Sequence, residues 1–336
     1  MKTEPVRTIS DIARLAGVSK STVSRALNDS PLIGEETKER VRALAKEHKF
    51  VMNASAQRLS LKQSHVIGLM THAHTSDWST SDIFMLEVMS GISSGLRASG
   101  YDLLLIHADK DDESWADAYL GTGRVDGFIV LSASCTPRQV ENLVQLKAPF
   151  IMWGRSADSR RQCTVTGDSF AGGKLAAGHL LRIGRKRIAF LGGPATELEV
   201  ADRFAGYQEA LSEAGLEVDP ALVAYGDYTA QSGHAVMRGL LARNPDLDAV
   251  FVNSDLMAIG AMDAVREQGR VVPDDVAVVG YDDVSMARFS NPPLTTIRQN
   301  APLAGRLLAE NLVQFVQKGL VTNVTIPAEL VVRRSA

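Results

Sequence analysis

The chain has 336 residues, a net charge of −3 and 45% hydrophobic residues, which fits a globular protein of two or three domains. No stretch approaches 18 uninterrupted apolar residues and the first residues lack a hydrophobic signal core, so neither a membrane span nor secretion is expected. Its two cysteines, Cys135 and Cys163, have no CxxC spacing and no histidine cluster, which excludes a zinc site and fits a reducing cytoplasm.

Charge is distributed unevenly along the chain. Residues 1–62 contain 12 Lys and Arg against 7 Asp and Glu, whereas the remainder contains 24 against 32. A basic head on an acidic body indicates a nucleic-acid-binding module attached to a body with a different task.

Residues 8–27, TISDIARLAGVSKSTVSRAL, predict two short helices joined by a turn at Gly17. Ser10 and Ser19 stand where helix N-caps are expected. Apolar residues at helical spacing predict one inner face, made of Ile12, Ala13, Ala16, Val18, Val23 and Leu27. The outer face of the second helix is small, polar and basic, with Lys20, Ser21, Ser24 and Arg25. Such a face suits the major groove of DNA, although any small helical hairpin can produce the same pattern.

The next segments predict the end of this first module. A third helix is expected over residues 35–48, with Gly34 as its N-cap and apolar side chains that close a small core. Residues 53–64, NASAQRLSLKQS, are too polar for a core and predict a linker that becomes helical when supported. The headpiece is therefore expected at 1–52 and the linker at 53–64.

From residue 65 onward, continuous apolar strands alternate with amphipathic helices. The predicted helices span residues 82–99, 113–121, 137–146, 172–183, 201–214, 230–243 and 256–268. The predicted strands are HVIGLM, YDLLLIHA, DGFIVLSA, PFIMWG, RIAFLGG, ALVAYGD, DAVFVNS and VAVVGYDD. This alternation predicts two parallel sheets of about five strands each, joined by right-handed crossovers. No glycine-rich phosphate loop follows the first strand, which argues against a nucleotide-binding enzyme.

Seven segments stand in the order typical of one family: TISDIARLAGVSKSTVSRALN, NASAQRLS, RFAGYQEAL, AIGAMDAV, VVGYDDVS, PPLTTIRQ and ELVVRRS. In them the whole chain resembles the LacI/GalR family of bacterial transcriptional regulators. The resemblance implies an α/β fold class: an all-α helix-turn-helix headpiece, a hinge helix, and a periplasmic-binding-protein-like body of two doubly wound parallel-sheet subdomains. The effector-binding and dimerisation body would span 65–336, with subdomain one at about 65–155 and 295–319 and subdomain two at about 156–292 and 322–334.

The resemblance assigns DNA contacts to positions in the headpiece and the hinge. Positions that read bases are matched by Lys20, Ser21 and Arg25, and Arg25 is the best candidate for a bidentate guanine contact. Positions near phosphates are matched by Thr8, Thr22, Ser24 and Asn28, although capping and packing also account for Thr22 and Ser24. Hinge positions are matched by Asn53, Ala56 and Leu59, with Leu59 as a wedge in the minor groove, or else packed on its dimer mate. Met52 departs from the family, which usually has proline there.

The resemblance also assigns effector contacts in the body. In the second subdomain they are Arg203, Tyr228, Ser254 and Asp282, with Ser254 standing where asparagine is usual. In the first subdomain, Asp82 and Phe84 stand in the usual Asn-Pro-Phe-Phe position, and Trp78 and Trp153 lie near strand ends, where ligands bind in such folds. Structural readings stay open: Tyr228 and Trp153 as core aromatics, Asp282 as a helix cap, and Arg203 in an ion pair.

These features favour a cytoplasmic, homodimeric, allosteric repressor of a palindromic operator, without cofactor or metal. A small molecule, inferred to be a saccharide, would be the effector that controls it. A nucleobase or nucleoside effector is the main alternative. A periplasmic sugar-binding protein would share the body but not the headpiece. An enzyme is not expected. The nearest approach to a catalytic cluster is His72 and His74 beside Asp77, and histidines in such a loop are more often solvated than catalytic. The absence of C-terminal leucine heptads argues against a coiled-coil tetramer.

Overall fold

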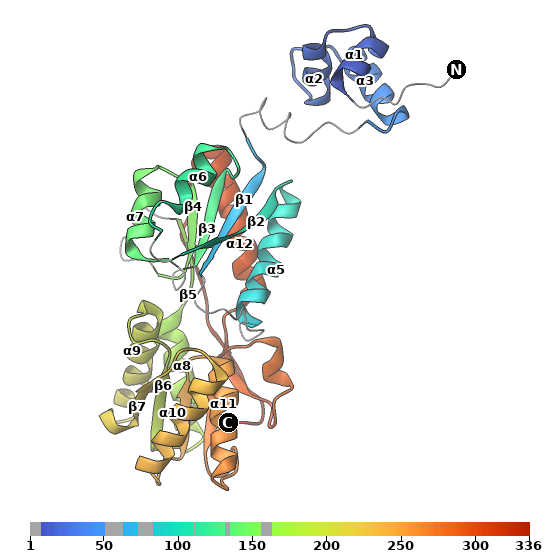
Figure 1. Ribbon diagram of the computed structural model, residues 1–336. Coiled ribbons are helices and arrows are strands. Elements are labelled where there is room, and N and C mark those ends of the chain that lie inside the picture. The colour runs from blue at the N-terminus through green and yellow to red at the C-terminus, as the bar shows by residue number, and fades with distance from the viewer. Residues whose placement is uncertain (1–7, 51–62, 73–82, 110–111, 132–134, 156–162) are drawn as a thin grey trace. The chain divides into compact units, whose positions relative to one another are not determined.

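A computed structural model describes residues 8–50, 63–72, 83–109, 112–131, 135–155 and 163–336 (Figure 1). The chain divides into two compact units, Met1–His65 and Val66–Ala336, which are described separately below. The first unit is the headpiece. The second unit holds two sheets and is called the body.

Over residues 8–50, the headpiece is a bundle of three helices, α1 (Ile9–Ala16), α2 (Lys20–Leu27) and α3 (Glu35–Glu47). Its buried core contains Ile12, Ala13, Ala16, Val23, Ala26, Val41 and Ala45. Val18 and Leu27 are partly buried against this core. The inner face predicted from helical spacing is therefore confirmed, as is the third helix.

Helix α1 begins two residues earlier than the sequence suggested. Its N-cap is Thr8, whose hydroxyl accepts from the amide of Asp11 at 3.3 Å, while the Asp11 carboxylate accepts from the Thr8 amide at 2.9 Å. The prediction of Ser10 as N-cap was wrong, because only Thr8 has an acidic side chain three residues later to complete a capping box. Ser19 does cap α2, accepting from the amide of Thr22 at 3.1 Å.

Thr8→Ala should lower the free energy of unfolding of the headpiece by about 1 kcal/mol, because the first-turn amides of α1 lose their acceptor. Amide hydrogen exchange of α1 in the full-length protein measures this loss. Ser10→Ala is the matched control and should leave α1 protection nearly unchanged, since Ser10 lies inside the helix. Equal losses in the two variants would contradict the capping assignment.

The body contains two six-stranded sheets. The first has the order β11-β5-β4-β3-β1-β2, and all its strand pairs are parallel. Its strands are β1 (Val66–His72), β2 (Asp102–Ala108), β3 (Gly127–Leu131), β4 (Phe150–Trp153), β5 (Cys163–Gly167) and β11 (Val324–Ile326). The second has the order β12-β10-β9-β8-β6-β7, and only the β10–β12 pair is antiparallel. Its strands are β6 (Ile188–Gly192), β7 (Val223–Tyr225), β8 (Ala249–Val252), β9 (Ala277–Asp282), β10 (Thr295–Arg298) and β12 (Glu329–Val331).

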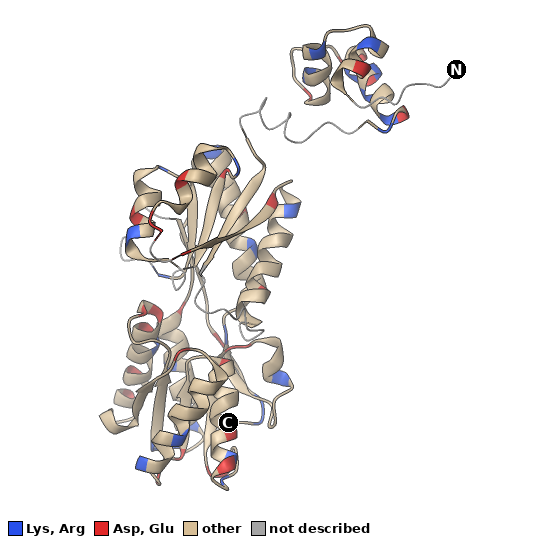
Figure 2. Cartoon of the chain, viewed as in Figure 1, with Lys and Arg blue, Asp and Glu red and all other residues tan. Residues whose placement is uncertain are grey.

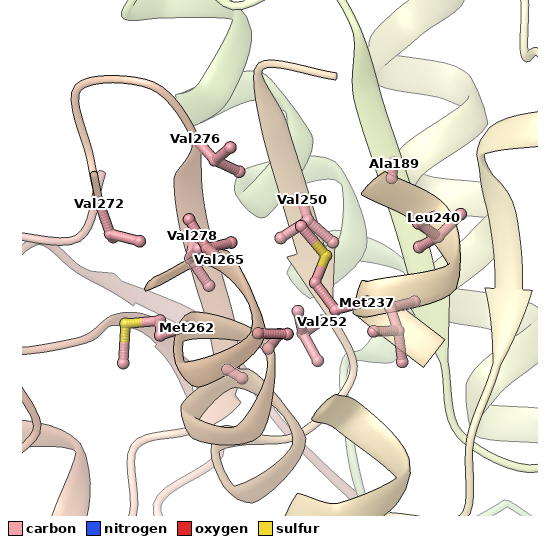
Figure 3. Packing of buried hydrophobic residues seen from close by; sticks show 14 of the residues in the cluster. Ala189, Met237, Leu240, Val250, Val252, Met262, Val265, Val272, Val276 and Val278 are labelled. Carbon is pink, nitrogen blue, oxygen red and sulfur yellow. The ribbon is translucent and has the colours of Figure 1, made fainter. Parts of the chain in front are cut away.

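Helices cover both faces of each sheet. On the first sheet, α5 (Ile83–Ala98) and α12 (Ala301–Lys318) pack on one face, and α6 (Trp115–Gly121) and α7 (Pro137–Gln145) on the other. On the second sheet, α8 (Ser169–Arg182) and α9 (Leu198–Glu213) cover one face, and α10 (Ala230–Arg243) and α11 (Asp255–Glu267) the other. Figure 3 shows side chains from α10, α11 and the strands beneath them filling the last of these cores. Among the described residues, the body also contains two short 3-10 turns, Pro220–Leu222 and Ser285–Arg288.

The boundaries of the two subdomains differ from those expected. β5 and β11 belong to the first sheet, although residues 156–292 and 322–334 were expected in the second subdomain. Conversely, β10 pairs with β9 in the second sheet, although residues 295–319 were expected in the first subdomain. The chain therefore crosses between the sheets after β5, after β10 and after β11. CTVTG and VTI are too short and too polar to read as strands, so strand pairing rather than hydrophobic pattern sets these boundaries.

Three helix pairs cross with their backbones in close contact. Each pair contributes one glycine from each helix: Gly91 and Gly305 in α5/α12, Gly173 and Gly206 in α8/α9, and Gly233 and Gly260 in α10/α11. A Cβ atom at any of them would collide with a carbonyl oxygen of the partner helix, for example that of Val88 for Gly305. Glycine at these crossings lets each pair pack closely on its sheet.

No helix in the part of the chain that the structure describes is long and apolar enough to cross a bilayer. The same described residues contain no group of three His, Cys, Asp or Glu side chains arranged to hold a metal ion.

Candidate functional site

The first candidate surface is the outer face of α2 in the headpiece. Lys20, Ser21 and Arg25 are exposed there, so the three predicted base-reading side chains lie on solvent. Ser24 is partly buried on the same helix, and Asn28 caps its end. The Thr22 hydroxyl lies 2.8 Å from that of Ser19, so Thr22 has a capping role in addition to any role near phosphate. Thr8 is likewise both exposed and engaged in its capping box.

Some basic residues of the headpiece are neutralised within it. Lys38 contacts Glu35 at 2.7 Å and Asp29 at 3.0 Å, and Arg42 contacts Asp29 at 2.7 Å. Hydrogen bonds from these two cations lower the pKa of the Asp29 carboxyl. Among the described residues no salt bridge engages Lys20 or Arg25, so the positive charge of α2 stays available to a polyanion (Figure 2).

Several predicted site residues lie outside the described residues. They are Asn53, Ala56 and Leu59 of the linker, Trp78 and Asp82 of the loop after β1, and His74 and Asp77 beside them. Their predicted roles stay predictions.

The second candidate surface is the carboxyl edge of the second sheet, where Arg203 is the central cation. Arg203 lies on α9 and only 5% of it is exposed. Its guanidinium donates to the carbonyl oxygen of Asn253 at 2.8 Å and stacks 3.7 Å from the centroid of the Tyr281 ring. A backbone carbonyl and an aromatic face therefore hold this side chain at the end of β8 and β9.

Tyr228 supplies a half-buried aromatic ring to the same edge. It precedes α10 in the left-handed conformation, with φ of 70°, and its ring lies against Gly193 at the end of β6, where a Cβ atom would collide with it. Its hydroxyl donates to the Glu197 carboxylate at 2.7 Å, and burial raises the pKa of that carboxyl. Glu197 was not predicted. An acidic residue opening the helix after β6 was the only sequence signal for it.

Asp282 ends β9 and faces the start of α12. Its carboxylate accepts from the Gln299 side chain at 2.7 Å. Gln299 was not predicted, because only the crossing after β10 brings it there. Neighbouring Asp255 is fully buried and accepts from the hydroxyl of Thr296 and from the amide of Val284. Burial, and then the charge of Asp282, raise the pKa of the Asp255 carboxyl well above its ordinary value.

Ser254 is buried and caps α11, accepting from the amide of Met257 at 3.2 Å. This capping role accounts for Ser254 without a ligand, and its effector role stays a prediction. On the first sheet, Phe84 and Trp153 form an aromatic pair with ring centroids 5.9 Å apart. Both rings are partly buried against the α5/α12 core, so Trp153 has a packing role there.

Three polar contacts, made by Arg155 and Glu87, join the carboxyl edges of the two sheets. Just after β4, the amide of Arg155 donates to Glu199 at 2.6 Å, and its guanidinium pairs with Asp202 of α9. On α5, Glu87 accepts from the amide of Ser285 at 2.9 Å, in the turn after β9. These contacts place the aromatic pair on the same side of the body as the polar edge of the second sheet.

Comparisons with known proteins match both parts of the chain. Residues 8–53 match the model of bacterial regulatory proteins of the lacI family, and residues 177–336 match a periplasmic binding protein-like domain. The chain is 36% identical over 312 residues to the HTH-type transcriptional regulator CelR of Thermobifida fusca, covering 92% of each chain. It is 30% identical to the HTH-type transcriptional repressor PurR of Haemophilus influenzae, covering 98% of each.

Two solved structures resemble the whole chain. A transcriptional regulator CelR–cellobiose complex has a TM-score of 0.76 and 33% identity, covering 98% of this chain and 99% of that one. The lac repressor dimer bound to operator and the anti-inducer ONPF has a TM-score of 0.83 and 29% identity, covering 99% of each chain.

Proposed function

The chain belongs to the LacI family of bacterial regulators, and on that premise we propose that it is a transcriptional repressor whose operator affinity is controlled by a saccharide. One observation carries the choice of ligand: an aromatic ring, a carboxylate and a guanidinium, from Tyr228, Asp282 and Arg203, share the carboxyl edge of the second sheet. Sugars offer apolar C–H faces for stacking and hydroxyl groups that pair with charged side chains.

The CelR–cellobiose complex, similar over nearly the whole chain, favours a glucoside or a disaccharide. A purine or nucleoside remains the second candidate, because PurR is also a relative and because Tyr228 and the Phe84–Trp153 pair provide rings for a planar base. The charged pair of Arg203 and Asp282 favours the sugar, since hydroxyl groups both donate to and accept from charged side chains.

The proposed mechanism has two states. One arrangement of the subdomains lets a homodimer place two headpieces on a palindromic operator in the cytoplasm. The sugar prefers the other arrangement and lowers operator affinity by that difference in binding free energy. The dimer bound to operator in the lac repressor structure supports the assembly with DNA.

A thermal-shift and operator-release experiment tests this function. Full-length protein is heated with cellobiose, gentiobiose, ribose, guanine or adenosine, because a ligand that binds only the folded state raises the melting temperature. Its operator is selected from random DNA, and release by the stabilising compound is measured by gel mobility. If only guanine or adenosine raises the melting temperature, the second candidate is supported. If no sugar raises it, the proposal of a saccharide effector is refuted.

Arg25→Ala should weaken specific operator binding by about 1–3 kcal/mol and relax the preference at one base pair, because the guanidinium is exposed on the outer face of α2. Competition binding on single-base operator variants measures it. Arg97→Ala, on α5 of the body, is the control and should leave base preference unchanged. An unaltered base preference in Arg25→Ala would show that another residue reads that position.

Leu59→Ala should weaken operator binding and reduce the bend of the operator, since the proposed wedge between base pairs is removed. Energy transfer between dyes at the two operator ends measures the bend. A bend equal to that of the unaltered protein would leave the wedge without support.

A further inference from the structure

Arg155 joins the two sheets through contacts that all end on one helix. Its amide donates to the Glu199 carboxylate at 2.6 Å, and its Nη1 atom donates to both carboxylate oxygens of Asp202, at 2.5 and 2.8 Å. Both acceptors lie in α9 on the second sheet, whereas Arg155 follows β4 of the first sheet. Arg298, at the end of β10, pairs instead with Asp283, which follows β9 of the same sheet. The contacts of Arg155 with α9, called the Arg155 bridge below, therefore connect the two subdomains.

Both ends of the Arg155 bridge are anchored in their own subdomains. On the first sheet, the amide of Gly154 donates to the carbonyl oxygen of Val165 in β5 at 2.9 Å, and Gly154 turns the chain out of β4 with a φ of 105°. On the second sheet, α9 packs so closely on α8 that a Cβ atom at Gly206 would collide with the carbonyl oxygen of Phe170. The bridge thus connects two well-packed elements, so it constrains the subdomains themselves.

The bridging residues adjoin residues that are proposed to bind the sugar. Trp153 stands two positions before Arg155, and Arg203 follows Asp202 directly. Trp153 belongs to the aromatic pair of the first sheet, and Arg203 is the central cation at the edge of the second. The Arg155 bridge therefore acts on the spacing between the groups that the two subdomains offer to one ligand.

We infer that Arg155 is a positioning residue, whose bridge to α9 holds the two sheet edges at the spacing that the sugar needs. The inference rests on the proposed saccharide effector. When only a fraction of the molecules has the arrangement that binds a ligand, the apparent affinity falls by that fraction. An arrangement that is held in advance also lowers the cost of ordering the site on binding. Because the bridge acts on the arrangement and not on the ligand, its loss should weaken the binding of every sugar by the same factor.

A double-mutant cycle in the full-length protein tests this role, with Arg155→Ala, Asp202→Asn and the two combined. Cellobiose, and each other sugar that raises the melting temperature of the unaltered protein, is titrated calorimetrically into each variant. Ion pairs that are partly exposed contribute modestly, so each single variant should lose about two- to fivefold in affinity, equally for all sugars. The double variant should lose no more than either single one, because both changes remove the same contact.

Arg138→Ala is the matched control for the cycle. The Arg138 guanidinium is exposed and pairs with Glu113 at 2.8 Å, but both residues belong to the first subdomain. Removing this ion pair should leave the affinity for sugar unchanged.

Amide hydrogen exchange gives a readout that needs no sugar. The amide of Ser285 donates to the Glu87 carboxylate at 2.9 Å, a contact between the sheet edges in which Arg155 takes no part. If the bridge holds the edges together, the turn containing Ser285 should exchange roughly two- to fivefold faster in Arg155→Ala and in Asp202→Asn. A purely local role of Arg155 would leave this exchange unchanged, as Arg138→Ala should.

Three results would overturn the inference. Affinities that fall by different factors for different sugars would mean that Arg155 contacts the ligand directly. Unchanged affinities, or losses that multiply in the double variant, would show that the bridge does not position the site. If no sugar binds the unaltered protein, the saccharide proposal fails, and exchange at Ser285 alone decides whether the bridge holds the edges together. Exchange equal to that of the unaltered protein would then refute the bridge as well.

Discussion

Replacing Arg203 with lysine should leave a repressor that binds its operator but no longer releases it when cellobiose is added. Lysine keeps the charge but loses the planar group that stacks on Tyr281 and donates to the carbonyl of Asn253, so the two are not equivalent here. A hydrogen bond to a charged group contributes about 1.5–3 kcal/mol, which corresponds to roughly a 10- to 150-fold loss of sugar affinity.

Calorimetric titration of cellobiose and operator-release assays measure this loss. Arg238→Lys, at an exposed position on α10, is the matched control and should respond to sugar normally. The melting temperature of Arg203→Lys identifies a purely structural role: a large drop in stability without a change in sugar affinity would contradict the assignment of Arg203 to the effector site.

Gly305→Ala should destabilise the body. Overpacking usually costs about 1–3 kcal/mol, and we expect the loss here to lie at the upper end of that range. The added methyl group meets the carbonyl oxygen of Val88 and the amide of Ile92 in the facing helix, and backbone atoms cannot rotate away as a side chain can. Urea denaturation of the full-length protein, followed by circular dichroism, measures the change in the free energy of unfolding.

Gly178→Ala is the control for this prediction. Gly178 lies inside α8 with nothing within 4 Å of an added Cβ atom. Alanine there should stabilise the protein by about 0.5–1 kcal/mol, because it reduces the freedom of the unfolded chain. Destabilisation by both substitutions would mean that helix crossing distance is not the cause.

The elements that were predicted correctly from the sequence are those defined by the spacing of neighbouring residues. The inner face of the headpiece and the strands with continuous apolar runs follow from local spacing, which the structure repeats. β5 was missed because CTVTG is short and half polar, and its strand identity depends on pairing with β4 and β11. The N-cap was predicted at Ser10 from residue type alone. Thr8 is the N-cap instead because the Asp11 side chain returns a hydrogen bond to its backbone amide.

The candidate site was predicted only where family position fixes a residue. Arg203, Tyr228 and Asp282 lie at one edge as expected, but Glu197 and Gln299 reach them from other segments. Their partners are 31 and 17 residues away in the chain, beyond the range of any local pattern. The need for glycine at the helix crossings could not be predicted from the sequence either, since it arises from contact with the backbone of another helix.

The three crossings between the sheets also govern how the body can form during synthesis. Each sheet has an edge strand from near the end of the chain, Val324–Ile326 in the first and Glu329–Val331 in the second. The first sheet is incomplete until residue 326 has left the ribosome and the second until residue 331, whereas the three described helices of the headpiece are complete by residue 47. A nascent chain should thus display a folded headpiece while both halves of its body still await their last strands, and the two halves then close nearly at the same moment.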